Sequence, residues 1–260
     1  MTTLYRFSTR LQKLAATAAL VGGMAPLGAS ALALDTTFLQ ANSVFALSDM
    51  AFDAMALSGT TISSLGNASL VTGAAATGVP AFNLPVTKVD VSLGLPLFGP
   101  LVTPNSGAAS GSALLISRGQ KNITLANFVI DYKSSLVMAD ITANGLTQKY
   151  TSLYSFEAPD LQIGLQGLTL NMHQQLSNLV LTPTALTSFS SGLGLSKFFQ
   201  NTINGLDFGT ITVDINGALR FGLSDKAFVA SSVPEAPSMA AMALGLVGIA
   251  AVSRRKAAQR

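Results

Sequence analysis

The feature that most restricts the fold is a pair of alternating segments joined by Asn144-Gly145. Residues 136–143 and 148–156 alternate apolar and polar side chains, which is typical of strands with one buried face. Asn-Gly is the residue pair best suited to a two-residue hairpin turn, because both positions tolerate a positive φ. This part of the chain therefore predicts a tight β-hairpin.

Similar alternation recurs on both sides of this hairpin. Residues 123–130 alternate with a one-residue slip that is typical of a β-bulge, and residues 161–172 alternate in two phases. Residues 211–223 alternate around a second Asn-Gly pair, Asn216-Gly217, which predicts a second turn. Short strands with regular turns predict a mainly β fold, an antiparallel sandwich or barrel-like domain with one or two helices.

One helix is predicted to begin at Asp49. Ser48 is a good N-cap, the Asp49 carboxylate suits the positive end of a helix, and Gly59 ends the segment. The apolar face is expected to consist of Met50, Phe52, Met55 and Leu57.

The remaining segments carry weaker signals. Residues 184–203 favour helix in part, although Gly192 and Gly194 weaken it. Residues 59–118 contain prolines that we expect to break any long regular element. These prolines are Pro80, Pro85, Pro96, Pro100 and Pro104.

Composition favours an exported protein over a cytosolic enzyme. Charged residues make up only 10% of the 260 residues, and Gly, Ser, Thr and Ala are abundant. The absence of cysteine excludes disulfides, thiolate metal sites and a cysteine nucleophile. Residues 34–232 hold eight basic and eleven acidic residues, so this part lacks the clustered positive charge that nucleic-acid binding needs.

The first 33 residues have the three parts of a secretory signal peptide. Three basic residues precede the apolar run 14–27, and small residues at Ala31 and Ala33 supply cleavage sites. We predict a signal helix that is removed after Ala33. The alternative is an uncleaved N-terminal anchor, which Pro26 and the Gly22-Gly23 pair disfavour.

The C-terminus combines a proline-rich motif, an apolar run and a basic cluster. Apolar residues 239–252 predict a helix of about 21 Å, shorter than the ~30 Å hydrocarbon core, and therefore a marginal permanent anchor. The basic cluster is expected to stay in the cytoplasm. The motif is Pro234, Glu235, Ala236 and Pro237, and the basic stop-transfer cluster is Arg254, Arg255 and Lys256.

This order of parts resembles the PEP-CTERM sorting domain of Gram-negative bacteria, over residues 233–256. The resemblance implies that an exosortase recognises and cleaves the tail after an intermediate in the inner membrane. It also implies a final location at the cell surface or in the extracellular matrix. The second proline of the motif stands one position later here than in the family. The alternative is an ordinary tail anchor that is never cleaved.

The body, residues 34–232, has a second resemblance, to secreted bacterial β-domains of the HtaA type. The pattern that carries it is the succession of residues 54–66, 84–87, 111–115 and 125–131. Some members of that group bind haem, so the resemblance implies a ligand-binding β-domain as one possibility.

No residue pattern in the body predicts catalysis, a cofactor or a metal site. His173 is the single histidine, and we expect it to be a structural residue. Tyr150 and Tyr154 are predicted to share one strand face, where they could stack on a sugar or haem. Asp49 and Asp53 would share one helix face, where they are expected to start the helix and face solvent. Glu157 and Asp160 flank Pro159 in a predicted loop, where two carboxylates could serve glycoside hydrolysis or bind calcium, but no D-x-D-x-D-G calcium loop is present.

These observations predict a non-enzymatic surface or matrix protein that an exosortase sorts. Its role is expected to be structural or adhesive, in contact with exopolysaccharide in a biofilm. The alternative is a binding module for haem or glycan, held by the same tail.

Overall fold

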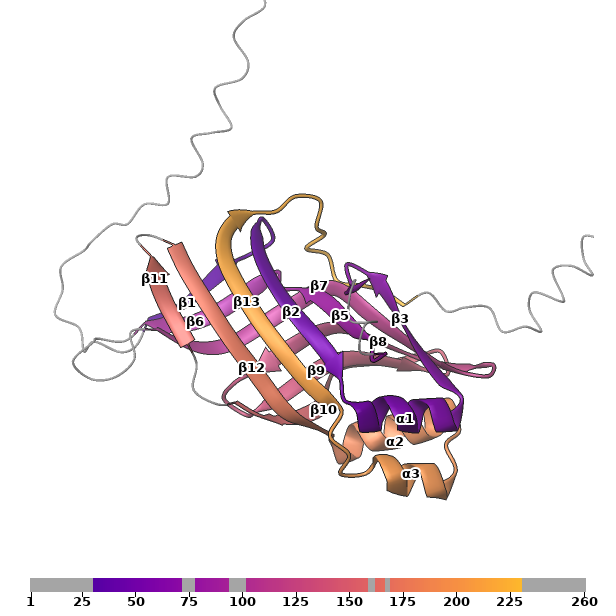
Figure 1. Ribbon diagram of the computed structural model, residues 1–260. Coiled ribbons are helices and arrows are strands. Elements are labelled where there is room, and N and C mark those ends of the chain that lie inside the picture. Colours follow the sequence, from indigo (N-terminus) through magenta and orange to yellow (C-terminus); the bar gives the residue numbers. More distant parts are fainter. Residues whose placement is uncertain (1–29, 72–77, 94–101, 159–161, 167–168, 231–260) are drawn as a thin grey trace, which may run out of the picture.

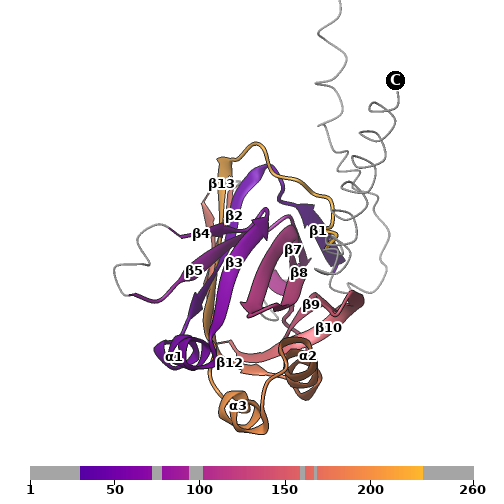
Figure 2. The same cartoon turned by 90° about the vertical axis from the view of Figure 1, so that its right-hand side faces the viewer.

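The structure is a computed structural model that describes residues 30–71, 78–93, 102–158, 162–166 and 169–230. In this part of the chain, 13 strands form one curled antiparallel sheet, and three helices lie together at one end of it (Figure 1, Figure 2). The helices are α1 (Asp49–Ser58), α2 (Pro183–Leu193) and α3 (Lys197–Ile203). The strands are β1 (Ser30–Asp35), β2 (Leu39–Leu47), β3 (Thr60–Gly66), β4 (Ser69–Leu70), β5 (Ala81–Pro85), β6 (Lys88–Leu93), β7 (Val102–Arg118), β8 (Lys121–Asp131), β9 (Leu136–Ala143), β10 (Leu146–Glu157), β11 (Gln162–Gln166), β12 (Thr169–Leu181) and β13 (Gly209–Leu219).

The sheet is an open half-barrel. Its strand order is β1-β6-β7-β8-β9-β10-β12-β13-β2-β5-β4, with β3 added to β7 and β11 added to β12. The long strands β7 to β10 form a meander, and β2 lies beside β13, so the two ends of the body meet in the sheet. The prediction of a mainly antiparallel β fold is confirmed, with three helices in the described residues rather than one or two.

The local turn signals of the central meander are confirmed. Asn144 and Gly145 have φ values of 50° and 76° and join β9 to β10 as a two-residue turn. The predicted bulge in residues 123–130 lies at Asn127, where φ is 53° and the β8–β9 register shifts.

The ends of α1 are as predicted, but its buried face is not. The Ser48 hydroxyl oxygen accepts a hydrogen bond from the Ala51 amide at 3.1 Å, and Gly59 ends the helix with φ 68°. The buried side chains are Ala51 and Ala54, three residues apart. Met50 and Leu57 are 62% and 79% exposed, so the expected apolar face was wrong in these residues. Ala51 and Ala54 share one face of the helix, and both line a cavity between α1 and the sheet.

The segment 184–203 contains two helices. Thr182 caps α2, Pro183 stands in its first turn, and Gly194 ends it with φ 61°. Ser196 then caps α3. Gly194, one of the two glycines that weakened the helix prediction, therefore separates α2 from α3.

Two predicted interruptions of the strands, one turn and one proline break, were wrong. Asn216-Gly217 does not reverse the chain, because β13 runs on to Leu219 beside β2 and the register slips between Asn216 and Leu219. The same two residue types that form a tight turn also fit a bulge, and the continuing partner strand decides between them. Pro104 likewise lies inside β7, where it faces Val91 at a register shift of the β6 ladder.

The predicted membrane segments lie outside the described residues. Within the part of the chain that the structure describes, no helix is both long and apolar enough to cross a membrane. The predicted cleavage residues Ala31 and Ala33 lie on β1, opposite Ser92 and Asp90 of β6, with exposed side chains. Cleavage after Ala33 stays a prediction, and it would leave only two residues of β1.

After β13 the chain crosses the molecule as an irregular segment, residues 220–230, which we call the C-terminal strap (Figure 1). Arg220 begins it. Its guanidinium donates hydrogen bonds to the carbonyl oxygens of Ala41 at 2.7 Å and Val86 at 2.8 Å. Further bonds go to the Thr36 and Thr37 carbonyl oxygens and to the Asn42 side chain. Desolvation lowers the pKa of Arg220 from its ordinary value.

Two asparagine side chains hold the rest of the strap. Asn127 accepts from the Phe228 amide at 2.7 Å and donates to the Phe228 carbonyl oxygen at 3.0 Å. Asn67 pairs in the same way with the amide and carbonyl of Ser224. A Cβ on Gly111 would lie 2.9 Å from the Lys226 carbonyl oxygen, so glycine is needed where the strap passes over β7.

Candidate ligand pocket

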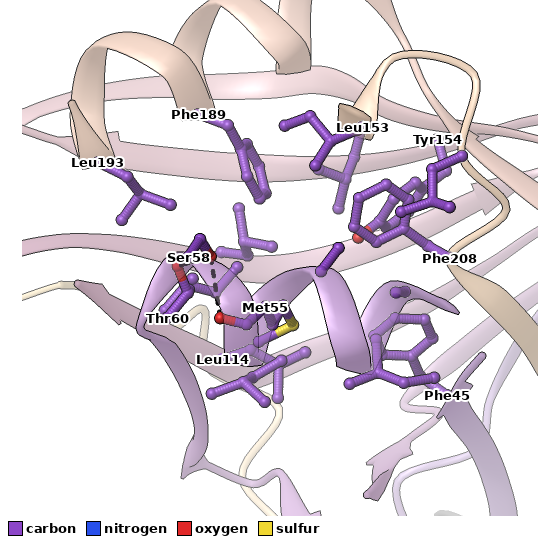
Figure 3. Close-up of a pocket in the computed structure, with 18 of the residues that line it drawn as sticks. Phe45, Met55, Ser58, Thr60, Leu114, Leu153, Tyr154, Phe189, Leu193 and Phe208 are labelled. Carbon is purple, nitrogen blue, oxygen red and sulfur yellow. Dashed lines mark hydrogen bonds between the residues drawn. The ribbon is translucent and has the colours of Figure 1, made fainter. Parts of the chain in front are cut away.

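A cavity of about 60 Å³ lies between the curled sheet and the three helices. Figure 3 shows Phe189 and Leu193 of α2, Met55 of α1 and Phe45 of β2 around this one space. Its lining contains no charged side chain. The partly exposed rim on the α3 side is formed by Phe199, Ile203 and Leu206. We call this cavity the helix-covered pocket.

Arg118, the last residue of β7, holds the helices over the pocket. Its Nε donates to the carbonyl oxygen of Ser58 at 2.8 Å, at the C-terminus of α1. Its Nη1 donates to the carbonyl oxygens of Leu193 and Gly194 at the end of α2. The guanidinium also lies 5.9 Å from the centre of the Phe199 ring on α3. A cation is favourable at a helix C-terminus, so one side chain fastens all three helices.

Two of the polar atoms in the pocket satisfy each other. The Ser58 hydroxyl donates to the Met55 carbonyl oxygen at 2.9 Å and lies 2.8 Å from the Thr60 hydroxyl (Figure 3). The α1–β3 connection therefore brings no unpaired hydroxyl to the pocket.

Tyr154 of β10 is the exception. Its side chain is 6% exposed and lines the pocket, and its ring packs 5.4 Å from Phe208 and 6.1 Å from Phe45 between centroids. Among the residues that the structure describes, none forms a hydrogen bond with the Tyr154 hydroxyl. Burial raises the pKa of this hydroxyl well above its usual value, so it stays protonated and is a hydrogen-bond donor.

A second, smaller cavity of about 20 Å³ adjoins the helix-covered pocket. Tyr132 lies on its wall. Four apolar residues line both cavities, so only side chains separate them. These residues are Leu84, Phe128, Val137 and Ile211.

The residues singled out in the sequence lie elsewhere. His173 on β12 faces Asp214 on β13, directly opposite, and its Nδ1 is hydrogen bonded to the Asp214 carboxylate on the exposed surface. This agrees with a structural histidine. Tyr150 and Tyr154 do not share an environment: Tyr150 is 59% exposed with φ 50°, and two register shifts lie between residues 148 and 154. The expected shared face was wrong because alternation does not survive bulges.

Three of the four residues of the acidic pairs lie in the described part of the structure. Asp49 and Asp53 lie exposed on α1 as expected, and Glu157 accepts a hydrogen bond from Asn178. Asp160 lies outside the described residues. In the described ranges no group of three or more His, Asp or Glu side chains could hold a metal ion.

Sequence reasoning missed the pocket. Its walls come from eight strands and three helices, and each wall residue has the local sequence pattern of an ordinary core residue. The signal that was present is the small-residue pair Ala51 and Ala54, which leaves space where α1 meets the sheet.

Comparison with known proteins identifies one sequence motif. Residues 232–256 match the PEP-CTERM protein-sorting motif. The chain thus carries the signal of an exported protein that an exosortase processes, with a membrane-anchored intermediate. The motif residues 234–237 and 254–256 lie outside the described part of the structure. No curated protein matches the chain.

Two solved structures align with about seven tenths of this chain. Heme binding protein HtaB from Corynebacterium glutamicum is 12% identical, with a TM-score of 0.42, over 74% of this chain and all of that one. The C-terminal domain of HtaA from the same organism is 10% identical, with a TM-score of 0.42, over 69% of this chain and 99% of that one. These structures are of the type that the sequence pattern of the body resembled.

Proposed function

We propose that the chain is a non-enzymatic protein of the cell surface or extracellular matrix of a Gram-negative bacterium. Its role is structural or adhesive, and its matrix partner is exopolysaccharide in a biofilm. The observation that supports this proposal is the sorting motif at residues 232–256, which follows directly on the docked C-terminal strap. A folded body that ends in such a tail is suited to display outside the cell.

The test of the sorting step is a change in the motif that keeps hydrophobic length and charge at the basic cluster. We expect Pro234→Ala with Glu235→Ala to accumulate as a larger, membrane-bound precursor in the native host, because the exosortase no longer reads the tail. The matched control replaces Arg254, Arg255 and Lys256 with Ser, which removes the charges that oppose translocation. Equal size and equal membrane binding of the Pro234/Glu235 variant and the wild type would establish an ordinary tail anchor instead.

The matrix role has its own test. Deletion of the gene in the native host should weaken the cohesion of the biofilm, and secreted wild-type protein should co-sediment with purified exopolysaccharide. Normal cohesion together with no co-sedimentation would contradict the structural or adhesive role, whatever the fate of the tail.

A second candidate function is ligand binding by the body. The helix-covered pocket favours it, because Tyr154, whose hydroxyl has no hydrogen-bond partner among the described residues, lines an apolar cavity. The lining favours an apolar ligand such as haem over a glycan, which needs several hydrogen-bonding groups. A cavity of about 60 Å³ holds about four to six waters, so a larger ligand requires the helices to move outward.

Hemin titration separates the two candidates. A structural protein gives no saturable Soret shift. A haem-binding module gives a shift that is lost in Tyr154→Phe and kept in His173→Ala, since His173 lies away from the pocket.

A further inference from the structure

The helix-covered pocket and the adjoining cavity together form one candidate binding site with a larger and a smaller part. The larger part contains the Tyr154 hydroxyl, and the smaller part lies beyond the wall shared by Phe128 and Val137. Both parts are lined almost entirely by carbon, with no charged side chain. Such an interior fits a ligand that is a chain of methylene groups rather than a compact polar molecule.

The volume limits the length of that chain. The two cavities of about 60 Å³ and about 20 Å³ hold roughly six water-sized groups between them, and a methylene group is of similar size. A linear chain of about six to eight carbons therefore fits with small rotamer changes at the shared wall. A much longer chain would have to displace α1 or α2 from Arg118.

The polar end of the ligand is set by Tyr154. Its protonated hydroxyl can donate one hydrogen bond, and Phe45 and Phe208 fix the position of the ring. A neutral oxygen, from an alcohol, ketone or ester, would accept this bond. A carboxylate would be buried with no cation beside it, because Arg118 is already bonded to three carbonyl oxygens at the helix ends.

We propose that the interior of the half-barrel binds a neutral medium-chain aliphatic compound, an alcohol, ketone or ester, with its oxygen on Tyr154 and its chain toward the cavity beside Tyr132. This assignment rests on the ligand-binding role of the pocket proposed above and names the class of ligand. The partly exposed rim of Phe199, Ile203 and Leu206 is the entrance.

The test is calorimetric titration of the mature protein, recovered from its host, with three probes of one length: 1-octanol, octanoate and n-octane. We expect 1-octanol to bind with the highest affinity and octanoate at neutral pH to bind at least tenfold more weakly. Tyr154→Phe should lower the affinity for 1-octanol by about two- to tenfold, the value of one hydrogen bond, and leave that for n-octane unchanged. Tyr150→Phe, the exposed control, should change neither.

A second variant tests the direction of the chain. Val137→Phe narrows the passage between the two cavities, so it should lower the affinity for 1-octanol and leave the affinity for 1-butanol unchanged. Octanoate bound as tightly as 1-octanol, or 1-octanol binding that is absent or indifferent to both Tyr154→Phe and Val137→Phe, would overturn the assignment. Hemin binding without 1-octanol binding would also overturn it while the haem-binding function stands, and loss of tail processing bears on neither.

Discussion

The two ends of the half-barrel differ in the balance of polar and apolar contacts that hold them. At the strap, Arg220, Asn67 and Asn127 each give several directed hydrogen bonds to backbone groups. At the helix-covered pocket, Arg118 gives such bonds to the ends of α1 and α2, but the side chains that face the sheet are mostly apolar and enclose a cavity. Hydrogen bonds to fixed carbonyls tolerate little displacement, whereas apolar contacts can slide and repack. The bonds at the strap end therefore fix the strap in one position, whereas the helices at the pocket end can move to admit a ligand.

The largest effect is expected when the strap is released at Arg220, its first residue. Arg220→Met should lower the free energy of unfolding by about 3 kcal/mol, because several buried carbonyl oxygens lose a charged donor at once. Urea unfolding of the wild type and the variant measures this. Arg220→Lys keeps the charge but not the planar fork, so it should recover less than half of the loss. A loss below about 0.5 kcal/mol in Arg220→Met would show that the strap end is not specified by these bonds.

At the opposite end, the matching change is Arg118→Met. We expect a loss of about 2 kcal/mol and faster hydrogen exchange at the C-terminal turns of α1 and α2, since their last carbonyl oxygens lose the guanidinium. The strap amides should exchange at the wild-type rate. Exchange that rises equally at both ends would mean that the two regions unfold as a unit.

Asn127 allows the strap to be loosened without strain in β8. Asn127→Gly removes the amide but accepts the φ of 53°, and it should cost about 1 to 2 kcal/mol and make residues 221–230 sensitive to protease. Asn127→Ala should cost about 1 kcal/mol more, because a Cβ disfavours the left-handed conformation. Equal stability of the Gly and Ala variants would contradict the strain argument.

The smallest effect is expected from filling the pocket. Ala54→Leu fills part of the cavity from α1. The free energy of unfolding should therefore change by less than about 1 kcal/mol, and ligand binding should be lost. The control is Ala113→Leu at a fully buried position of β7 that does not line the pocket, where overpacking should cost about 1 to 3 kcal/mol. Equal destabilisation at both sites would mean that the pocket has no free space.

Local signals in the sequence predicted the parts of the fold that depend on neighbouring residues. The Asn144-Gly145 turn, the bulge at Asn127 and the caps of α1 each follow from the preferences of a few residues. Asn216-Gly217 shows where this reasoning fails, because the choice between turn and bulge is made by β2, about 175 positions earlier in the chain.

The pocket and the strap could not be predicted for the same reason. Asn127 meets Phe228 across 101 residues, and Asn67 meets Ser224 across 157. Phe45 and Phe189 face one cavity only because β2 and α2 are brought together by the curl of the sheet. Contacts of this range depend on topology, which alternation and capping signals do not encode.

The strap also decides how the body carries mechanical load. A pull on the tail enters the described structure near residue 230 and reaches the Asn127 pair first, then the Asn67 pair, and then Arg220. Only after all three attachments have failed does force act on the end of β13, which lies inside the sheet between β12 and β2. The attachments of the strap thus bear tension before the sheet does. Tension on the tail would first break hydrogen bonds that can re-form, while the sheet and its pocket stay intact.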